Sequence, residues 1–560
     1  MKWHCLCVIQ NLQIKVVFLS SFFSNIDVII LFVYLILSLV IGIYYSRRSD
    51  KNTEEYFLAG RSIGWVAIGL TIFSTNISSE HFIGLAGSGA SRGLAVGQFE
   101  LMAIFILIFL GWILAPVYLK SGVKTMPELM EKRFDVRIRK FFAAISVLIY
   151  LFTKISVTLF AGGILFYTIF GFNIYASAVV IVLLTGIYSL IGGAKAVIKT
   201  GVFQASVLLI GAMIMTIFGL KEVGGISGLT SKLPDDFFNM FKSISDPDFP
   251  WTGILFGAPI IAFWYWCTDQ YIVQKILSAK TVNDARRGTL LTALLKVLPL
   301  FILVVPGLIA AALYPNVQGD EAYATLLAGD LLPAGIKGFV LAGLLAAIMS
   351  SLSSVFNVTS ALYTNDIYKP NHKNASEREL VLVGRLTTAV ITFAAILCVP
   401  LVRQIDSQVY LYLQSVQAYF GPPIAALFIL GLTIKSVNAK GALIGLIIGE
   451  CIGLTRLGAD LIVHSSFPVF SFVKFYAGIN FLHFAIILFI FSSLSIVAVS
   501  LLTKSKIEPG INKVKLLFNE SINEIRINII NRGTFRGYKV NLILSAFIVL
   551  VIISLWSFLY

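Results

Sequence analysis

The chain has 560 residues, of which 58% are hydrophobic and only 13% are charged, and it carries a formal net charge of +15. A soluble protein could not hide so much apolar surface, so a soluble enzyme is excluded and most of the chain must be solvated by lipid. The positive charge does not indicate a nucleic-acid-binding protein, because the chain has no basic stripe interleaved with aromatic residues.

Apolar stretches recur along the chain, and each is about 20 residues long, the length of a helix that crosses a bilayer. Such helices satisfy every backbone amide within their own segment. We therefore predict an all-α polytopic membrane protein in which an N-terminal extension, 1–26, is too broken by polar residues to span. The fourteen predicted segments are 27–46, 64–90, 96–119, 141–170, 174–192, 200–220, 252–274, 288–313, 336–366, 379–402, 408–432, 440–457, 477–502 and 541–559.

The 43 Lys and Arg residues fall mainly on alternate loops between these segments. The loops that follow odd-numbered segments are the basic ones, and 120–140 and 503–540 are the richest of them. Cytoplasmic loops of membrane proteins carry an excess of Lys and Arg. The pattern therefore predicts that these loops are cytoplasmic and that both termini lie outside.

The second segment, 64–90, is interrupted by a polar stretch from Ser74 to His81. Unwound backbone is tolerated at membrane depth only where it lines a cavity or is buried in protein, and in transporters such breaks bind ions and substrates. The stretch is either such a break or an ordinary loop between two short helices.

A second interruption, from Trp264 to Gln270, lies inside segment 252–274. The two interrupted segments are separated by four intact ones, as the first members of two five-helix inverted repeats would be. This coincidence favours a transporter over a channel or a membrane-anchored enzyme.

Segment 336–366 carries Ala347, Ser350 and Ser351 on one helical face, because positions i, i+3 and i+4 lie side by side. Oxygens on this face could converge on a small, hard cation. Serines in membrane helices also serve helix packing, and the pattern alone leaves both interpretations open.

Two ionisable residues lie inside or at the edge of apolar segments. Lys296 stands well within segment 288–313, and an intramembrane Lys is a candidate functional residue because its charge must be paired or face water. Glu100 begins segment 96–119 and is either a ligand or an interfacial carboxylate near a helix N-terminus.

The sequence lacks the motifs of common enzymes and metal sites. It has no Walker loop, nucleophile elbow or HExxH pair. Its five Cys residues are scattered and predict neither a disulfide framework nor a metal site. We therefore expect no enzymatic activity.

Several motifs together resemble the sodium/solute symporter family, and in particular its sodium/glucose cotransporter branch. The resemblance covers about residues 27–559 and implies a LeuT-like fold with a 5+5 inverted-repeat core. That core would be 64–432, with one additional helix, 27–46, before it and the additional helices of 440–560 after it. The motifs are Asn76-Ile-Ser-Ser-Glu-His-Phe-Ile-Gly-Leu-Ala-Gly87, Thr125-Met-Pro-Glu128, Lys132-Arg-Phe134, Trp264-Tyr-Trp-Cys-Thr-Asp-Gln270 and Gly421-Pro-Pro423.

The resemblance also implies two sets of site residues. A co-transported sodium ion would be bound by backbone carbonyls of Ser74, Ile77 and Ala347 and by the hydroxyls of Ser350 and Ser351. The family's sugar-binding positions match Asn76, His81, Glu100, Tyr265, Trp266, Lys296 and Gln414. Neutral amides, a neutral imidazole, a carboxylate and an ammonium can together pair the hydroxyls of a polyol, and Tyr265 would resemble an inner gate stacked on the sugar ring.

This sequence departs from the family pattern at some positions. Gly201 stands where the family commonly has an acidic residue, which puts sodium release or a second ion in question. Ala103 and Ala262 replace residues that are polar in the bacterial sugar transporter. A glucose- or galactose-like hexose is the expected substrate, with inositol or another small solute, or a transporter-shaped sugar sensor or ion-leak protein, as alternatives. The expected location is the plasma membrane of a bacterium, without an obligate protein partner.

Overall fold

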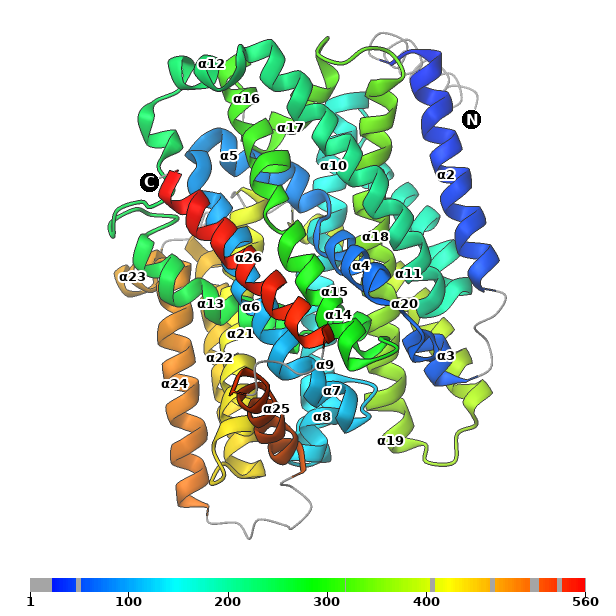
Figure 1. The fold of residues 1–560 in the computed structure, drawn as a ribbon, viewed down its shortest axis with the longest axis vertical. Coiled ribbons are helices and arrows are strands. Elements are labelled where there is room, and N and C mark those ends of the chain that lie inside the picture. The colour runs from blue at the N-terminus through cyan, green and yellow to red at the C-terminus, as the bar shows by residue number, and fades with distance from the viewer. Residues whose placement is uncertain are drawn as a thin grey trace.

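A computed structural model describes residues 23–46, 52–317, 319–402, 408–463, 469–503, 513–530 and 536–558. Within these residues the secondary structure is helical, apart from two isolated β-bridges. Figure 1 shows the helices packed side by side as one bundle, with the C-terminal helix α26 (Arg536–Phe558) crossing its front at a tilt. The predicted all-α polytopic fold class is correct.

Eleven helical stretches in the described residues are long and apolar enough to cross a membrane, and three shorter apolar helices accompany them. The shorter ones are Trp65–Asn76, Ile174–Gly186 and Gly253–Thr268, which fall in three of the predicted segments. Length and composition therefore support eleven of the fourteen predicted crossings directly. The eleven are Asn25–Ser46, His81–Ser121, Val136–Phe170, Gly193–Val223, Val282–Leu313, Ile336–Asn371, Glu377–Leu397, Val409–Thr433, Ala439–Val463, Phe481–Leu502 and Tyr538–Phe558.

Two predicted segments, 174–192 and 200–220, are joined in the structure. Together they form α11 (Ile174–Val223), a stretch of 50 residues. Gly193 interrupts it with a φ of 55°, a left-handed backbone conformation that a glycine adopts without steric cost. Two helices therefore meet at this break, as the two predicted segments require, but residues 194–199, expected to form a loop, belong to the second helix.

The first broken helix lies where the sequence predicted it. α4 (Trp65–Asn76) ends at Asn76, and Ile77 has an extended backbone with a ψ of 110°. Helical structure resumes after this break and leads through a π-helical turn, His81–Leu85, into α5 (Ala86–Arg92). Ser and Asn side chains offer the backbone alternative hydrogen bonds, which explains why the helix stops in this polar stretch.

The second broken helix also lies at its predicted place. α13 (Ala258–Phe263) continues into a π-helical turn, Trp264–Thr268, and the helix then stops at Asp269. The Asp269 side chain accepts a hydrogen bond from the Tyr271 amide and caps the next helix, α14 (Gln270–Leu277). The break therefore restarts a helix at a fixed point.

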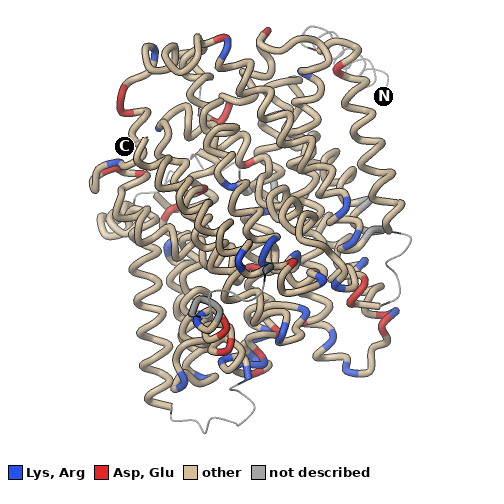
Figure 2. The backbone as a smooth tube through the Cα atoms, viewed as in Figure 1, with Lys and Arg blue, Asp and Glu red and all other residues tan. Residues whose placement is uncertain are grey.

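The basic side chains gather toward one end of the bundle. Figure 2 shows Lys and Arg concentrated at the lower end of the view, where four short helices lie (Figure 1). One of these helices, α25 (Lys513–Ile530), occupies much of the basic segment 503–540, which is therefore partly helical. The others are α3 (Thr53–Leu58), α8 (Met126–Arg133) and α19 (Lys369–Asn371). Most of the N-terminal extension 1–26 lies outside the described residues.

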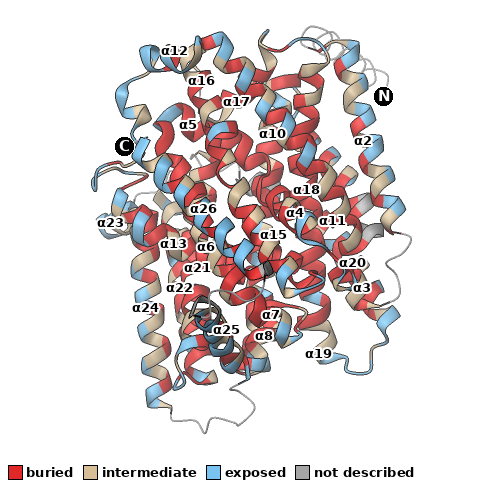
Figure 3. Cartoon of the chain, viewed as in Figure 1, coloured by how far each residue is buried: buried red, intermediate tan, exposed pale blue. Residues whose placement is uncertain are grey.

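The core of the bundle surrounds α18 (Ile336–Leu362). Of its most apolar window, 94% is buried, and the helix packs against α11, α4 and α20 (Glu377–Val402). By contrast, α2 (Asn25–Ser46) and α24 (Phe481–Leu502) expose apolar side chains along their outer faces (Figure 3). This distribution places α18 in the protein interior and the outer helices against lipid.

Candidate functional site

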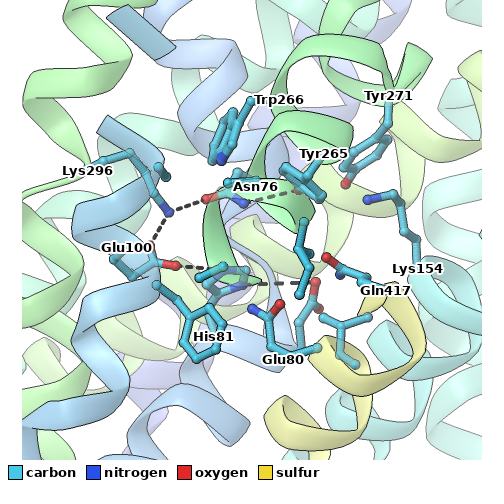
Figure 4. Close-up of a pocket in the computed structure, with 17 residues that line it drawn as sticks. Asn76, Glu80, His81, Glu100, Lys154, Tyr265, Trp266, Tyr271, Lys296 and Gln417 are labelled. Atoms are coloured by element: carbon cyan, nitrogen blue, oxygen red, sulfur yellow. Dashed lines mark hydrogen bonds and ion pairs between the residues drawn. The ribbon is translucent and has the colours of Figure 1, made fainter. Parts of the chain in front are cut away.

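All seven residues predicted to bind the substrate line one cavity at the centre of the bundle. They come from both broken helices, from α6 (Gln98–Phe109), from the end of α15 (Val282–Leu295) and from α21 (Val409–Thr433). The cavity has a volume of about 50 Å³, much smaller than the roughly 300 Å³ or more of a typical ligand pocket. The seven are Gln414 and six that Figure 4 labels: Asn76, His81, Glu100, Tyr265, Trp266 and Lys296.

A buried ion pair forms one wall of this cavity. Lys296 lies where α15 (Val282–Leu295) ends, inside the predicted spanning segment, and its side chain is almost completely buried. Its ammonium pairs with the Glu100 carboxylate and donates to Asn76 Oδ1 at 2.7 Å. Glu100 is 4% exposed. The predicted alternative of an interfacial carboxylate is therefore wrong, because Glu100 faces a buried lysine.

His81 lies between two carboxylates. Its Nε2 is 3.8 Å from Glu100 Oε1, and its Nδ1 is 4.0 Å from Glu80 Oε1. The Tyr410 hydroxyl donates to the same Glu100 oxygen at 3.4 Å, and the Tyr410 ring packs edge-on against the imidazole. The wall thus offers carboxylate oxygens and ring nitrogens within a few ångströms of one another, and Tyr410 contacts both Glu100 and His81.

Aromatic rings form the opposite wall. Asn76 Nδ2 donates to the Tyr265 hydroxyl at 3.0 Å, which joins the first broken helix to the second. Trp266 stands beside Tyr265 with its ring 5.3 Å from the Lys296 ammonium. Flat apolar faces with polar edges, opposite hydrogen-bonding groups, suit a ligand that has both C–H and O–H surfaces.

The five residues predicted to bind sodium lie next to this cavity, between α4 and α18, and all are buried. Ser350 Oγ donates to Ser74 Oγ at 3.1 Å, and Ser351 Oγ donates to the Thr75 carbonyl at 3.1 Å. Ile77 and Ala347 complete the set on the same two helices. The serine face thus meets the broken end of α4, although its hydroxyls also pair with α4 as a packing role requires.

A family model described as the sodium:solute symporter family matches residues 56–449. The chain belongs to the sodium:solute symporter family. It is 38% identical to the sodium/glucose cotransporter 1 of Mus musculus over 523 residues, which cover 85% of this chain and 78% of that one. It is 39% identical to the sodium/myo-inositol cotransporter 2 of Bos taurus over 474 residues, 78% of this chain and 70% of that one.

Solved structures of other transporters have the same fold as this symporter. A sodium-coupled sialic acid symporter in a substrate-bound, outward-open state superposes with a TM-score of 0.73 at 24% identity, covering 86% of this chain and 98% of that one. Mhp1, a nucleobase-cation-symport-1 family transporter, superposes with a TM-score of 0.52 at 14% identity, covering 84% and 99%. These matches confirm the LeuT-like transporter fold.

Sequence reasoning missed some polar residues that line the cavity of this symporter. Lys154 is an intramembrane lysine in segment 141–170 and carries the same signal that singled out Lys296. Glu80 belongs to the polar stretch of the first break, and Gln417 follows Gln414 by three positions on one helical face. Tyr271, just beyond the second break, also lines the cavity but has no comparable signal.

Gly201 of this symporter faces the predicted sodium site. A Cβ at this position would lie 3.1 Å from Thr71 Cγ2 and 3.4 Å from Ser74 Oγ. An acidic side chain here would therefore begin in contact with a predicted sodium-binding residue. The departure noted in the sequence is a difference at the site itself.

Proposed function

We propose that the protein imports a neutral polyhydroxylated solute, a glucose- or galactose-like hexose, together with sodium. The observation that carries the proposal is the single cavity in which all seven predicted sugar-binding residues meet, next to the serine face of α18. The sodium/glucose cotransporter among the relatives supports the same substrate class.

The charge of the cavity favours a neutral solute. The Lys296 ammonium and the Glu100 carboxylate pair with each other, so neither is free to balance a charged substrate. A carboxylate substrate would add an uncompensated charge to a buried wall, and a zwitterionic amino acid would add two opposite charges, which is costly. Sugar hydroxyls, by contrast, can both donate to the carboxylate and accept from the ammonium.

The polar groups of the cavity are already paired with one another, and the sugar would replace those bonds. Asn76 bridges Lys296 and Tyr265, and Glu100 holds Lys296 and the Tyr410 hydroxyl. Each hydroxyl that takes over one of these partners also excludes an analogue that lacks it, because the partner would then be left unsatisfied. The cavity must widen from about 50 Å³ to admit a hexose, as expected of a site that opens and closes by alternating access.

Sodium would bind between α4 and α18 and supply the driving force. We propose Ser74, Ile77, Ala347, Ser350 and Ser351 as its ligands, because the serine hydroxyls of α18 meet the end of α4 where its helix stops. Each positive charge that enters down the membrane potential contributes about 2.3 kcal/mol per 100 mV. Uptake can therefore run against the sugar gradient.

The basic end of the bundle supports a topology for this transport. Lys and Arg gather at the end that holds α3, α8, α19 and α25 (Figure 2), and the positive-inside rule makes that end cytoplasmic. We propose that both termini face outward from a plasma membrane, which in a bacterium is the inner membrane.

The test is uptake of radiolabelled glucose and galactose into proteoliposomes. An inward sodium gradient should drive accumulation that an inward choline gradient does not. Unlabelled hexose should compete, whereas proline and lactate should not. Sodium-driven uptake of radiolabelled myo-inositol without uptake of either hexose would keep the mechanism and change the substrate, in line with the myo-inositol cotransporter among the relatives. Sodium current without net sugar uptake would contradict symport.

A further inference from the structure

Lys154 carries a buried ammonium held between two tyrosine rings. It lies in a π-helical turn, Leu151–Ile155, between α9 (Val136–Tyr150) and α10 (Ser156–Phe170), and is 6% exposed. Its Nζ is 4.0 Å from the ring centre of Tyr265 and 4.4 Å from that of Tyr271. Figure 4 shows the side chain entering beside these two rings at the edge of the cavity. Cation–π contacts are strongest when desolvated, as here.

The ammonium is also fixed by an ion pair at the second helix break. Its Nζ is 3.2 Å from Asp269 Oδ2. The other oxygen of Asp269 accepts from the Tyr150 hydroxyl and from the Tyr271 amide. Asp269 stands between Tyr265 and Tyr271 in the chain, so this pair anchors Lys154 at the point where the backbone turns from one ring to the other.

The two rings lead to different sites. The Tyr265 hydroxyl accepts from Asn76, a residue of the proposed sugar site. The Tyr271 hydroxyl donates to the Thr75 carbonyl at 2.7 Å and lies 3.4 Å from the Ser351 carbonyl. Ser351, a proposed sodium ligand, donates its own hydroxyl to the same Thr75 carbonyl. A continuous set of contacts thus runs from the sodium site through Lys154 to the sugar site.

We propose that Lys154 is the positioning residue that couples sodium binding to sugar binding in this protein. This rests on the proposed function. When sodium binds, it orders the broken end of α4 and so fixes the position of the Thr75 carbonyl. The Tyr271 ring is fixed with it, because its hydroxyl donates to that carbonyl. The ammonium, held by Asp269, transmits that position to Tyr265 and hence to Asn76. Lys154 needs no contact with the sugar, because its Nζ is already engaged by Asp269 and the two rings.

The test is the coupling factor between the two ligands in Lys154→Met. Equilibrium binding of radiolabelled glucose is measured in nanodiscs with and without saturating sodium, and the ratio of the two Kd values is the coupling factor. Ordinary coupling between two sites is about 5- to 150-fold, and we expect this in the wild type. In Lys154→Met we expect a coupling factor of about twofold or less.

Lys154→Met leaves the buried Asp269 carboxylate without its lysine, and the variant could fail to fold for that reason. Two further variants keep the test decisive in that case. Lys154→Met with Asp269→Asn removes the charge pair together, which is less costly than leaving one charge buried. Tyr271→Phe keeps both rings around the ammonium and removes only the hydroxyl that reaches Thr75 and Ser351. Both should also lower the coupling factor. Lys337→Met, at a buried lysine near the start of α18, is the matched control and should retain it.

The outcomes separate the inference from the function beneath it. A coupling factor that stays at the wild-type value in folded Lys154→Met would overturn the inference and leave symport intact. Parallel losses of both affinities with an unchanged ratio would show a merely structural lysine and would also overturn it. A wild type that binds sugar with no sodium dependence would overturn the proposed function itself.

Discussion

The Glu100–Lys296 pair gives the sharpest test of the central cavity. Glu100→Gln replaces a carboxylate by an amide of the same shape and leaves the Lys296 ammonium without its counter-ion. Lys296 is 1% exposed, and within the described part of the chain its remaining polar partner is Asn76 Oδ1 at 2.7 Å. Breaking a buried pair by removing one partner costs about 3–5 kcal/mol, because a charge is left uncompensated. We expect Glu100→Gln to lose about this much stability.

The double variant Glu100→Gln with Lys296→Met removes the charge from both sides. A buried ion pair replaced by groups of similar volume is often neutral in stability, so the double variant should recover most of the loss. It should not recover sugar binding, since a hydrogen bond to a charged group contributes about 1.5–3 kcal/mol and the sugar loses both charged partners. We expect glucose affinity to fall at least about tenfold in Glu100→Gln, in Lys296→Met alone and in the double variant.

Thermal unfolding in nanodiscs and equilibrium glucose binding measure the two effects separately. The double-mutant cycle on stability should show a coupling well above the roughly 0.5 kcal/mol within which independent sites add. Sodium binding should remain in every folded variant, because the polar contacts of Glu100 among the described residues are with Lys296, His81 and Tyr410 and not with the serine face. Additive stability losses, or a double variant that transports like the wild type, would refute the reasoning.

Three other predictions concern the sodium site and the outer surface. Ser351→Ala removes the hydroxyl that donates to the Thr75 carbonyl and should raise the sodium Kd about tenfold, or about 1.4 kcal/mol, in sodium-binding measurements, while sodium-free sugar affinity is kept. Gly201→Asp would place a carboxylate beside Ser74, and opposite charges attract, so the sodium concentration for half-maximal uptake should fall; an unchanged or raised value would show that the carboxylate does not reach the ion. Asp320 lies outside the spanning helices, and burial raises its pKa to about 6, above the value in the unfolded chain. The folded state therefore takes up a proton more readily, and it gains stability as pH falls from about 6 to 4. The gain is at most about 3 kcal/mol. Asp320→Asn should abolish this pH dependence of thermal unfolding. If Asp320 instead made the wild type less stable as pH falls over the same range, the prediction would be wrong.

The sequence predicts the membrane architecture well because the relevant physics is local. Hydropathy and helix breaks depend on short stretches, and both interruptions lie where the polar runs placed them. The two helices of α11 were predicted, but the sharp kink that joins them was not. The kink at Gly193 keeps a helical path through a stretch whose two Lys residues indicated a loop. Whether backbone bends or unwinds there depends on what packs against it, and Tyr56 does so in the fold.

The candidate site is predicted less completely. Residues that carry an unusual cost in lipid, such as Lys296 and Glu100, stand out in the sequence because a membrane tolerates them only for a reason. Lys154 carries the same cost and was overlooked. Its partner Asp269 is far away in the chain, and no local pattern pairs the two. Tyr271 could not be predicted from the sequence, because an aromatic residue is common in a membrane helix. Only the fold shows that its hydroxyl donates to Thr75, at the break in α4.

The break in α4 belongs to both proposed sites, and this sharing has a consequence for how symport can work. Ser74 and Ile77 face the proposed sodium site, whereas Asn76, between them, bonds Lys296 and Tyr265. Both proposed ligands would therefore contact the end of α4, and the contacts of Lys154 with Tyr271 and Tyr265 add the link that the coupling measurement tests. Gln414, on α21, lines the cavity without belonging to the break. Residues that line the cavity but lie outside the break can change which sugar is bound without changing how sodium and sugar binding affect each other. One family could thus keep its sodium mechanism while its substrates diverge.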